Sequence, residues 1–408
     1  RRIAYREHLG RFNRTLGMLC RLYIGGTAHE LGHALGLPHN EATPSEGFRW
    51  GVALMGSGNF AWRGEQVGKP GAFLTTASVA RLLSHPLMTQ SNRQRFAPTL
   101  AEMDQVHFAA RADGGIHLSG SVLADPPAYA LIADTDPEGG ANYDSHTWTA
   151  AVNEQGHFSL DITTLRSVPQ ELRLTVCHLN GGSSTVIRLP FGPRADADAM
   201  AADLTSTLSW RQAEADYLAG KKDRAAARCQ QALPQATASI APRLQHMLKL
   251  ARGQAATQPL SVLEGDEIHL ADVTPELADV GWGAPRRNEC YNPPGINQGV
   301  CLIVGGAFYS SGLYAHSPSK LRYSLDGTWH RFEATVGLQQ GAHQVGTGVF
   351  IVRGDGKELA RVGPLRMDES AKIQADITGV RQLELVTEPD GESNASSWTV
   401  WAAPRLMR

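Results

Sequence analysis

Residues 29–39 read His-Glu-Leu-Gly-His-Ala-Leu-Gly-Leu-Pro-His, and no other segment restricts the possible structures of this chain as much. His29 and His33 are four residues apart, so an α-helix would place both imidazoles on one face, one turn apart. Gly36 can adopt the left-handed conformation that ends a helix, and the chain can then turn back to bring His39 beside the other two. The segment therefore predicts that three imidazoles meet at one point.

Three imidazoles at this spacing suit a tetrahedral zinc whose fourth position stays open for water. Glu30 lies between the first two histidines, where its carboxylate can act as a general base on the metal-bound water. The alternative is a helix that carries two surface histidines and a carboxylate without any metal. Because so many fixed positions rarely coincide by chance, the pattern favours a zinc centre formed by His29, His33 and His39.

At these positions the sequence resembles the metzincin zinc peptidases, over roughly residues 20–90. Members of that family have a methionine turn beneath the metal, and the segment Leu-Met-Gly-Ser-Gly supplies Met55 as a candidate. The alternative for Met55 is an ordinary core methionine. Some members add a tyrosine ligand two residues after that methionine, but this position is Ser57 here. The resemblance therefore implies a zinc endopeptidase with three histidines and water at the metal, and with Glu30 as the general base.

Length and composition limit the remaining possibilities. A chain of 408 residues predicts about two to four domains, and a net charge of −2 gives no reason to expect nucleic acid as a partner. No apolar run approaches the ~20 residues that span a bilayer. Metzincin domains carry a twisted sheet before the metal-binding helix, yet 28 residues precede His29. We therefore expect a fragment, with a signal peptide and an upper peptidase subdomain upstream, and a secreted or cell-surface location.

The hydrophobic pattern divides the first half of the chain into a helical part and a strand-rich part. Apolar residues at three- and four-residue steps predict a helix over residues 3–24. A Gly-Gly pair followed by Thr27 as a possible N-cap predicts that the zinc-binding helix starts separately near Thr27. These helices and the motif define a metzincin-like subdomain over residues 1–112. Alternation with a period of two over residues 113–194 predicts an immunoglobulin-like β-sandwich.

Two turns within the predicted β-sandwich, at residues 153–156 and 180–182, are typical of β-hairpins. One loop of the same region is rich in carboxylates, which leaves two alternatives: a calcium site or a solvated loop. Its acidic residues are Asp134, Asp136, Glu138 and Asp144.

Five cysteines are few for a disulfide framework. Cys290 and Cys301 flank a turn-rich loop, so they are candidates for a disulfide, with two free thiols as the alternative. Cys20, Cys177 and Cys229 are typical of small buried residues.

The second half of the chain combines a helical spacer with another strand-rich region. Residues 195–257 have helical periodicity and predict a helical hairpin. Residues 258–408 carry ordered motifs, among them Val-Gly-Trp-Gly from residue 280 and Leu-Tyr-Ala-His-Ser-Pro-Ser from residue 313. These motifs are similar to those of the NPCBM domain. The resemblance implies a carbohydrate-binding β-sandwich of the jelly-roll type.

Aromatic side chains in this last region suit contact with the C–H faces of sugars. For each of them the alternative is a place in the core of the sandwich, where aromatic residues are common. The histidine of the second motif has a similar alternative, as a buried residue that holds a turn. The candidate carbohydrate-binding residues are Trp282, Tyr314, His316, Trp329 and Trp398.

These patterns together predict a multidomain α+β protein. Its parts are a helical metzincin-like lower subdomain, an immunoglobulin-like β-sandwich, a helical spacer and a C-terminal NPCBM-like β-sandwich. The leading hypothesis is a zinc endopeptidase that acts on proteins or glycoproteins and is targeted to carbohydrate by its C-terminal module. The alternative is a non-catalytic glycan-binding or adhesion protein with a structural or vestigial metal site.

Overall fold

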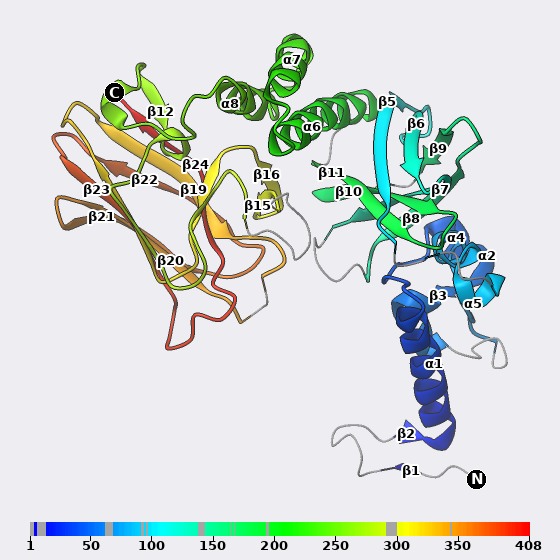
Figure 1. The fold of residues 1–408 in the computed structure, drawn as a ribbon. Helices are drawn as coiled ribbons and strands as arrows, with labels where there is room; N and C mark the ends of the chain where they lie inside the picture. Colours follow the sequence, from blue (N-terminus) through cyan, green and yellow to red (C-terminus); the bar gives the residue numbers. More distant parts are fainter. Residues whose placement is uncertain are drawn as a thin grey trace. The chain divides into compact units, whose positions relative to one another are not determined.

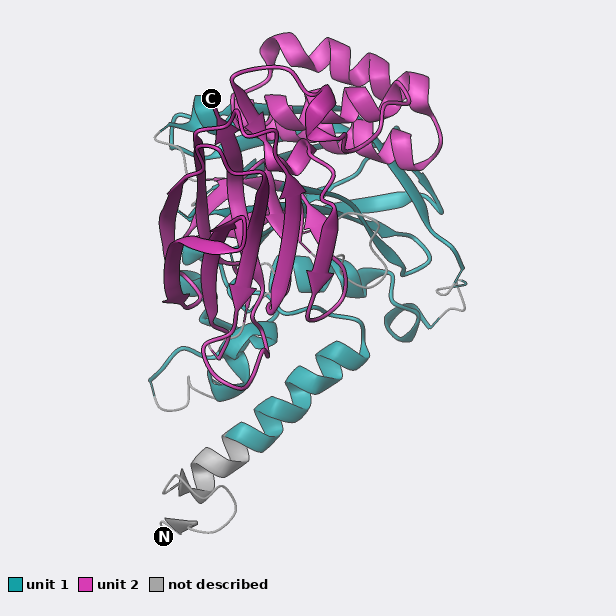
Figure 2. Ribbon diagram, turned by 90° about the vertical axis from the view of Figure 1, so that its left-hand side faces the viewer, with its two compact units in different colours: residues 1–189, 193–201 teal, residues 190–192, 202–408 magenta. Residues whose placement is uncertain are grey.

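The computed structural model of the chain describes residues 4–5, 14–61, 68–90, 94, 97–137, 143–163, 165–166, 168–192, 196–290, 300–342 and 345–408, with side chains from Leu22 onward. The chain forms two compact units, shown in different colours in Figure 2. Unit 1 comprises residues 1–189 and 193–201, and unit 2 comprises residues 190–192 and 202–408. Across the described residues, no helix combines the length and the apolar character needed to cross a membrane.

After two short strands, unit 1 forms a mainly helical part and continues as an antiparallel β-sandwich (Figure 1). Its elements are β1 (Ala4–Tyr5), β2 (Arg14–Thr15), α1 (Leu16–Ala34), α2 (Pro44–Trp50), β3 (Val52–Ala53), the helical turn η1 (Leu54–Gly58), α3 (Asn59–Ala61), β4 (Ala72–Phe73), α4 (Thr76–Leu83), α5 (Pro86–Thr89), β5 (Leu100–Ala110), β6 (Ile116–Asp125), β7 (Ala128–Asp136), β8 (His146–Ala151), β9 (His157–Ile162), β10 (Gln170–His178) and β11 (Ser183–Phe191).

The first long helix differs from the sequence-based prediction. Helix α1 begins at Leu16 and runs through the Gly-Gly pair, so the helix predicted over residues 3–24 is confirmed for residues 16–24, while its predicted start and the separate start near Thr27 are wrong. Thr27 lies inside the helix, where its hydroxyl donates to the carbonyl oxygen of Tyr23 at 2.8 Å. A threonine inside a helix commonly bonds back in this way instead of capping. Residues 6–13 of the predicted helix lie outside the described residues.

The β-sandwich of unit 1 has a three-stranded sheet, in the order β5-β6-β9, and a four-stranded sheet, in the order β11-β10-β7-β8. Buried and exposed residues alternate along β9, whereas β7 and β10 are buried at most positions. Two such sheets are expected of an immunoglobulin-like sandwich. The turn at residues 180–182 joins neighbouring strands, and the predicted hairpin is confirmed. The turn at residues 153–156 instead joins β8 to β9 in the other sheet, so that predicted hairpin is wrong. Strand β5 already belongs to the sandwich, which therefore begins before residue 113.

The described carboxylates predicted to lie in one loop are paired with arginines, and two of them, Asp134 and Asp136, lie in strand β7 instead of a loop. Arg173 forms ion pairs with the buried Asp136 and, at 3.6 Å, with Asp134, and burial raises the pKa of Asp134 to about 6. Asp144 pairs with a second arginine at 3.1 Å. Glu138 lies outside the described residues. Because the described carboxylates already have cationic partners, the structure favours an ion-pair network over the calcium alternative.

Unit 2 begins with three helices, α6 (Ala197–Leu218, of which the first residues belong to unit 1), α7 (Lys222–Ala232) and α8 (Ala241–Ala251). Trp210 is buried, and two arginines lie close to its ring: the guanidinium carbon of Arg211 is 4.2 Å, and that of Arg243 4.8 Å, from the ring centroid. Cys290 and Cys301 are buried and are not joined by a disulfide, so the candidate pairing is wrong. Arg211 donates to the Cys301 sulfur at 3.2 Å.

The rest of unit 2 is a β-sandwich whose sheets have the orders β14-β17-β24-β19-β22, with β12 paired to β24, and β13-β18-β23-β20-β21. Trp329, Phe332, Phe350 and Trp401 are among the buried residues between them. This confirms the predicted C-terminal β-sandwich. Its strands are β12 (Glu267–His269), β13 (Leu277–Val280), β14 (Arg286–Arg287), β15 (Leu302–Val304), β16 (Ala307–Tyr309), β17 (Gly312–Tyr314), β18 (Ser319–Ser324), β19 (Arg331–Leu338), β20 (Gly348–Gly354), β21 (Lys357–Leu365), β22 (Ser370–Asp376), β23 (Gln382–Glu388) and β24 (Thr399–Met407).

Candidate metal centre

Helix α1 ends where the glycine pattern predicted. Gly36 has a φ of +83°, and its N–H donates to the carbonyl of His33 at 2.8 Å. The N–H of Leu37 donates to the carbonyl of Gly32 at 3.0 Å, which completes the bond pattern of a left-handed helix end. Because this turn reverses the chain, His39 returns toward the helix face that carries His29 and His33.

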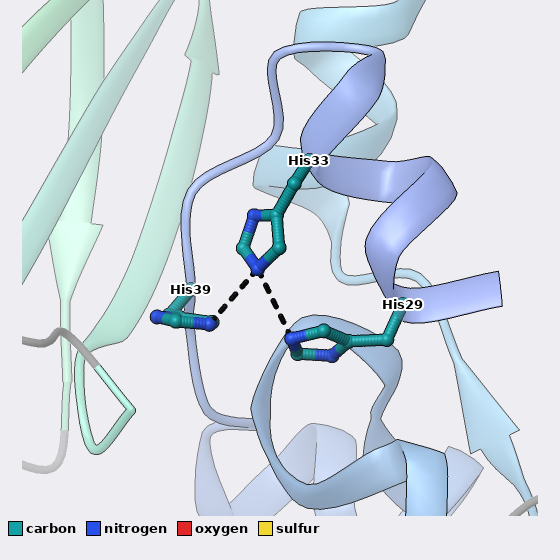
Figure 3. Close-up of side chains that lie close together, drawn as sticks. All are labelled: His29, His33 and His39. Carbon is teal, nitrogen blue, oxygen red and sulfur yellow. Dashed lines mark hydrogen bonds between the residues drawn. The ribbon is translucent and has the colours of Figure 1, made fainter. Parts of the chain in front are cut away.

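The three imidazoles converge as predicted (Figure 3). Nε2 of His33 lies 3.1 Å from Nε2 of His29 and 3.0 Å from Nε2 of His39. Two nitrogens bound at about 2.0–2.1 Å to a tetrahedral zinc would be about 3.3 Å apart, close to these values. Among the residues that the structure describes, this is the one cluster of three or more histidine, cysteine or carboxylate groups able to hold a metal ion.

Hydrogen bonds fix which nitrogen of each helix histidine faces the centre. His29 donates from Nδ1 to the carbonyl of Leu54 at 2.7 Å, and His33 donates from Nδ1 to the carbonyl of Leu37 at 2.9 Å. A carbonyl oxygen can only accept, so each Nδ1 carries the proton and each Nε2 presents a lone pair. Two lone pairs at 3.1 Å repel each other unless a cation lies between them. The donor set therefore fits a divalent metal such as zinc.

The predicted methionine lies directly beneath the helix. Met55 is fully buried, and a Cβ added to Gly32 would lie 2.3 Å from its sulfur, so only glycine fits at position 32 without displacing Met55. The sequence signal for this contact was the isolated glycine inside a helical pattern. Glu30 and Ser57 are exposed. The Glu30 carboxylate thus lies on the solvent side of α1, and the Met55 side chain lies on the side of α1 that faces the protein interior.

Asn40, which follows the third histidine, anchors the metal-site loop to helix α4, and its role was not predicted. It is buried and donates from Nδ2 to the hydroxyl of Ser78 at 3.0 Å, while Thr75 donates to its Oδ1 at 3.3 Å. Its backbone N–H donates to the carbonyl of Met55 at 3.3 Å. These bonds hold the loop that carries His39 against two neighbouring segments.

A segment of the β-sandwich also reaches the centre. The ring of Tyr143 stacks on His39, with 3.6 Å between centroids and 25° between planes. Next to it, the backbone N–H of Glu41 donates to the carbonyl of Ser145 at 2.8 Å. Nothing in the sequence pattern linked these residues, because about a hundred positions separate them along the chain.

Burial and the neighbouring Arg166 lower the pKa of His146, at the start of β8, from its ordinary value near 6.5 to about 4. Arg166 donates to its Nε2 at 3.0 Å. Because the unfolded chain takes up this proton first, the contribution of His146 to stability is complete above pH 6.5 and is lost as the pH falls toward 4.

We therefore expect His146→Gln to remove this loss of stability at acidic pH. Between pH 7 and pH 4 the unmodified protein should lose at most about 3 kcal/mol of unfolding free energy relative to the variant. Thermal unfolding of both proteins across this range measures the difference between their free energies of unfolding. Other titrating groups, such as Asp134, are present in both proteins, so their contributions cancel in this difference. The exposed His157→Gln is the control and should follow the unmodified protein. Identical pH profiles for His146→Gln and the unmodified protein would contradict the expectation.

In the C-terminal sandwich, the five candidate residues have different environments. Trp282 is 64% exposed, and its ring centroid lies 5.9 Å from that of the buried His316. His316 interacts through Nδ1 with the carbonyl of Ser317 at 2.8 Å, as a turn-holding histidine would. Tyr314 and Trp329 are almost completely buried, and Trp398 is partly buried against an apolar cluster. Of the predicted aromatic residues, Trp282 presents the most accessible ring to a ligand.

Comparison with known proteins identifies the C-terminal region. The sequence profile of the NPCBM/NEW2 domain family matches residues 266–407, so this part of the chain is an NPCBM domain. A protein of Renibacterium salmoninarum described as "Putative endo-alpha-N-acetylgalactosaminidase" is 27% identical over 128 residues, which are 31% of this chain and 8% of that protein. The chain thus spans less than a tenth of this relative.

Solved structures give partial likenesses. Wild-type OgpA from Akkermansia muciniphila is 31% identical, with a TM-score of 0.39, over 46% of this chain and 55% of that one. The module CBM51 from Clostridium perfringens GH95, solved with methyl-galactose, is 23% identical, with a TM-score of 0.31, over 35% of this chain and 99% of that one. Each of these likenesses covers less than half of this chain.

Proposed function

We propose that this protein is a zinc-dependent endopeptidase of the metzincin type, held on glycans or glycoproteins by its NPCBM domain. The observation that supports the peptidase is the convergence of the Nε2 atoms of His29, His33 and His39, two of which have their lone pairs fixed toward the centre. Glu30 adds a carboxylate that a purely structural metal site does not need.

In this proposal the residues of the chain divide the catalytic work. Zinc, when bound by the three Nε2 atoms, supplies a Lewis acid that polarises the scissile carbonyl and lowers the pKa of water. Glu30 accepts a proton from the attacking water at its carboxylate and later delivers it to the leaving amine nitrogen. Met55 keeps water out from beneath the histidines, so that substrate approaches from the exposed side of the helix, where Glu30 lies.

The NPCBM match and the exposed Trp282 support the glycan-binding part of the proposal. A sugar ring could stack on Trp282 through its C–H face, while the neighbouring His316 holds the adjacent turn. A peptidase that binds glycoproteins would act outside the cell or at its surface.

Cleavage of one glycoprotein and of its deglycosylated form, each with zinc, tests both parts. We expect cleavage of both, and Trp282→Ala should raise the KM for the glycosylated form about tenfold without changing kcat. The control Leu359→Ala truncates another partly exposed apolar residue of the same domain and should leave KM unchanged. If neither form of the glycoprotein is cleaved, the proposed peptidase activity is wrong. An unchanged KM for Trp282→Ala would contradict glycan binding at this tryptophan.

A further inference from the structure

Tyr143 contacts the third histidine of the metal centre from a different part of unit 1. It follows β7 in the chain and precedes β8, and its ring lies against His39 with 3.6 Å between centroids. The same ring is almost parallel to that of His29, at 6° and 6.4 Å. Tyr143 is 49% exposed, so burial in the sandwich core does not account for this position.

Several interactions hold the segment of Tyr143 beside the metal-site loop. Glu41 and His146 form a parallel β-bridge, and the Glu41 N–H donates to the carbonyl of Ser145 at 2.8 Å. Arg166 joins the two segments through their charges, because it pairs with both Glu41 and Asp144, the latter at 3.1 Å. Two segments about a hundred residues apart are thus joined by backbone bonds and by one shared arginine.

The stacking is an orienting contact on His39, as hydrogen bonds are on the other two histidines. His29 and His33 are oriented by carbonyl oxygens that accept from Nδ1. The face of Tyr143 restricts the ring plane of His39 in a comparable way, because the imidazole cannot rotate about its Cβ bond without losing the stack. Groups that orient metal ligands in this manner commonly change metal affinity by about 10- to 100-fold.

We propose that Tyr143 is a positioning residue of the metal centre, and that the β-sandwich thereby completes the site that the helical part begins. Its ring, rather than its hydroxyl, orients His39 for metal binding. This inference rests on the proposed function, since it assumes that the three histidines bind zinc.

Zinc affinity of the whole protein, measured by competition with a chromogenic chelator, tests the inference. We expect Tyr143→Ala to weaken zinc binding about tenfold and Tyr143→Phe, which keeps the ring, to bind as the unmodified protein does. The visible absorption of the Co²⁺-loaded protein gives a second readout, because its bands report coordination geometry. These bands should shift in Tyr143→Ala and stay in place in Tyr143→Phe. The control Leu123→Ala truncates an exposed apolar residue of the same sandwich and should change neither readout.

The outcomes separate the two proposals. If the unmodified protein binds zinc and Tyr143→Ala binds it equally well with unchanged Co²⁺ bands, the role of Tyr143 is wrong while the proposed function stands. If Tyr143→Phe is as weak as Tyr143→Ala, the hydroxyl acts instead of the ring, and the inference is also wrong. If the unmodified protein binds no zinc, both proposals fail. Thermal unfolding of each variant identifies any loss that comes from misfolding.

Discussion

Glu30→Gln is expected to lower kcat/KM for peptide hydrolysis by about 10²- to 10⁴-fold, the range that a general base contributes. Glutamine has nearly the same shape as glutamate but cannot accept the proton of the attacking water. Glu30 is exposed and is not one of the three converging groups, so zinc content should stay the same. Initial rates on a peptide substrate and metal analysis of the same preparation measure the two effects separately.

A matched control for this experiment is Glu154→Gln, which removes an exposed carboxylate from a turn of the β-sandwich. It should retain both full activity and full zinc content. If Glu30→Gln hydrolyses peptide as fast as the unmodified protein, Glu30 is not the general base. Loss of zinc together with activity would instead mean that Glu30 supports the metal site itself.

The parts of the site that the sequence predicted are those whose geometry is local. The spacing of His29 and His33 fixes their common helix face, and Gly36 fixes the turn that returns His39. Met55 was predicted through a family resemblance, and the structure places it under Gly32. Each of these relations spans fewer than about thirty residues, so a local pattern can encode it.

Contacts that depend on the tertiary fold could not be predicted in the same way. Tyr143 reaches His39 only because the sandwich folds against the metal-site loop, and Asn40 finds Ser78 only through the packing of α4. Neither pair leaves a periodic signal. The start of α1 was also missed, because local propensity places a Gly-Gly pair at the end of a helix, whereas α1 runs through this pair.

Strand patterns also leave open which aromatic residues outside the strands are buried. Trp282 and Trp329 are both aromatic residues of the C-terminal domain, yet the first is 64% exposed and the second is 1% exposed. Both tryptophans lie between strands, so the period of two that assigns strand residues to a face of a sheet does not apply to them. The turn at residues 153–156 shows the same limit, because a change of sheet and a hairpin need similar turn residues.

Loss of one metal ligand should have the second large effect. Nε2 of His33 lies within 3.1 Å of both other Nε2 atoms, so His33→Ala removes the ligand shared by the two close pairs. We expect zinc affinity to fall by more than about 100-fold, because replacing a residue that only orients a ligand already lowers metal affinity by about 10- to 100-fold. Peptide hydrolysis should be lost with the metal.

The stability of His33→Ala distinguishes a metal centre from a cluster of structural histidines. In the unmodified protein, zinc at about 100 times its Kd should stabilise the fold by about 2.7 kcal/mol, and this gain should disappear in the variant. Without metal the variant should be about as stable as the unmodified protein, because the lost bond to Leu37 is offset by relief of the repulsion between lone pairs. Thermal unfolding with and without zinc measures both quantities. The control His157→Ala, on the exposed face of β9, should keep the full zinc-dependent gain. A large loss of stability in the metal-free variant, with no response to zinc in either protein, would mean that the three histidines stabilise the fold and do not bind metal.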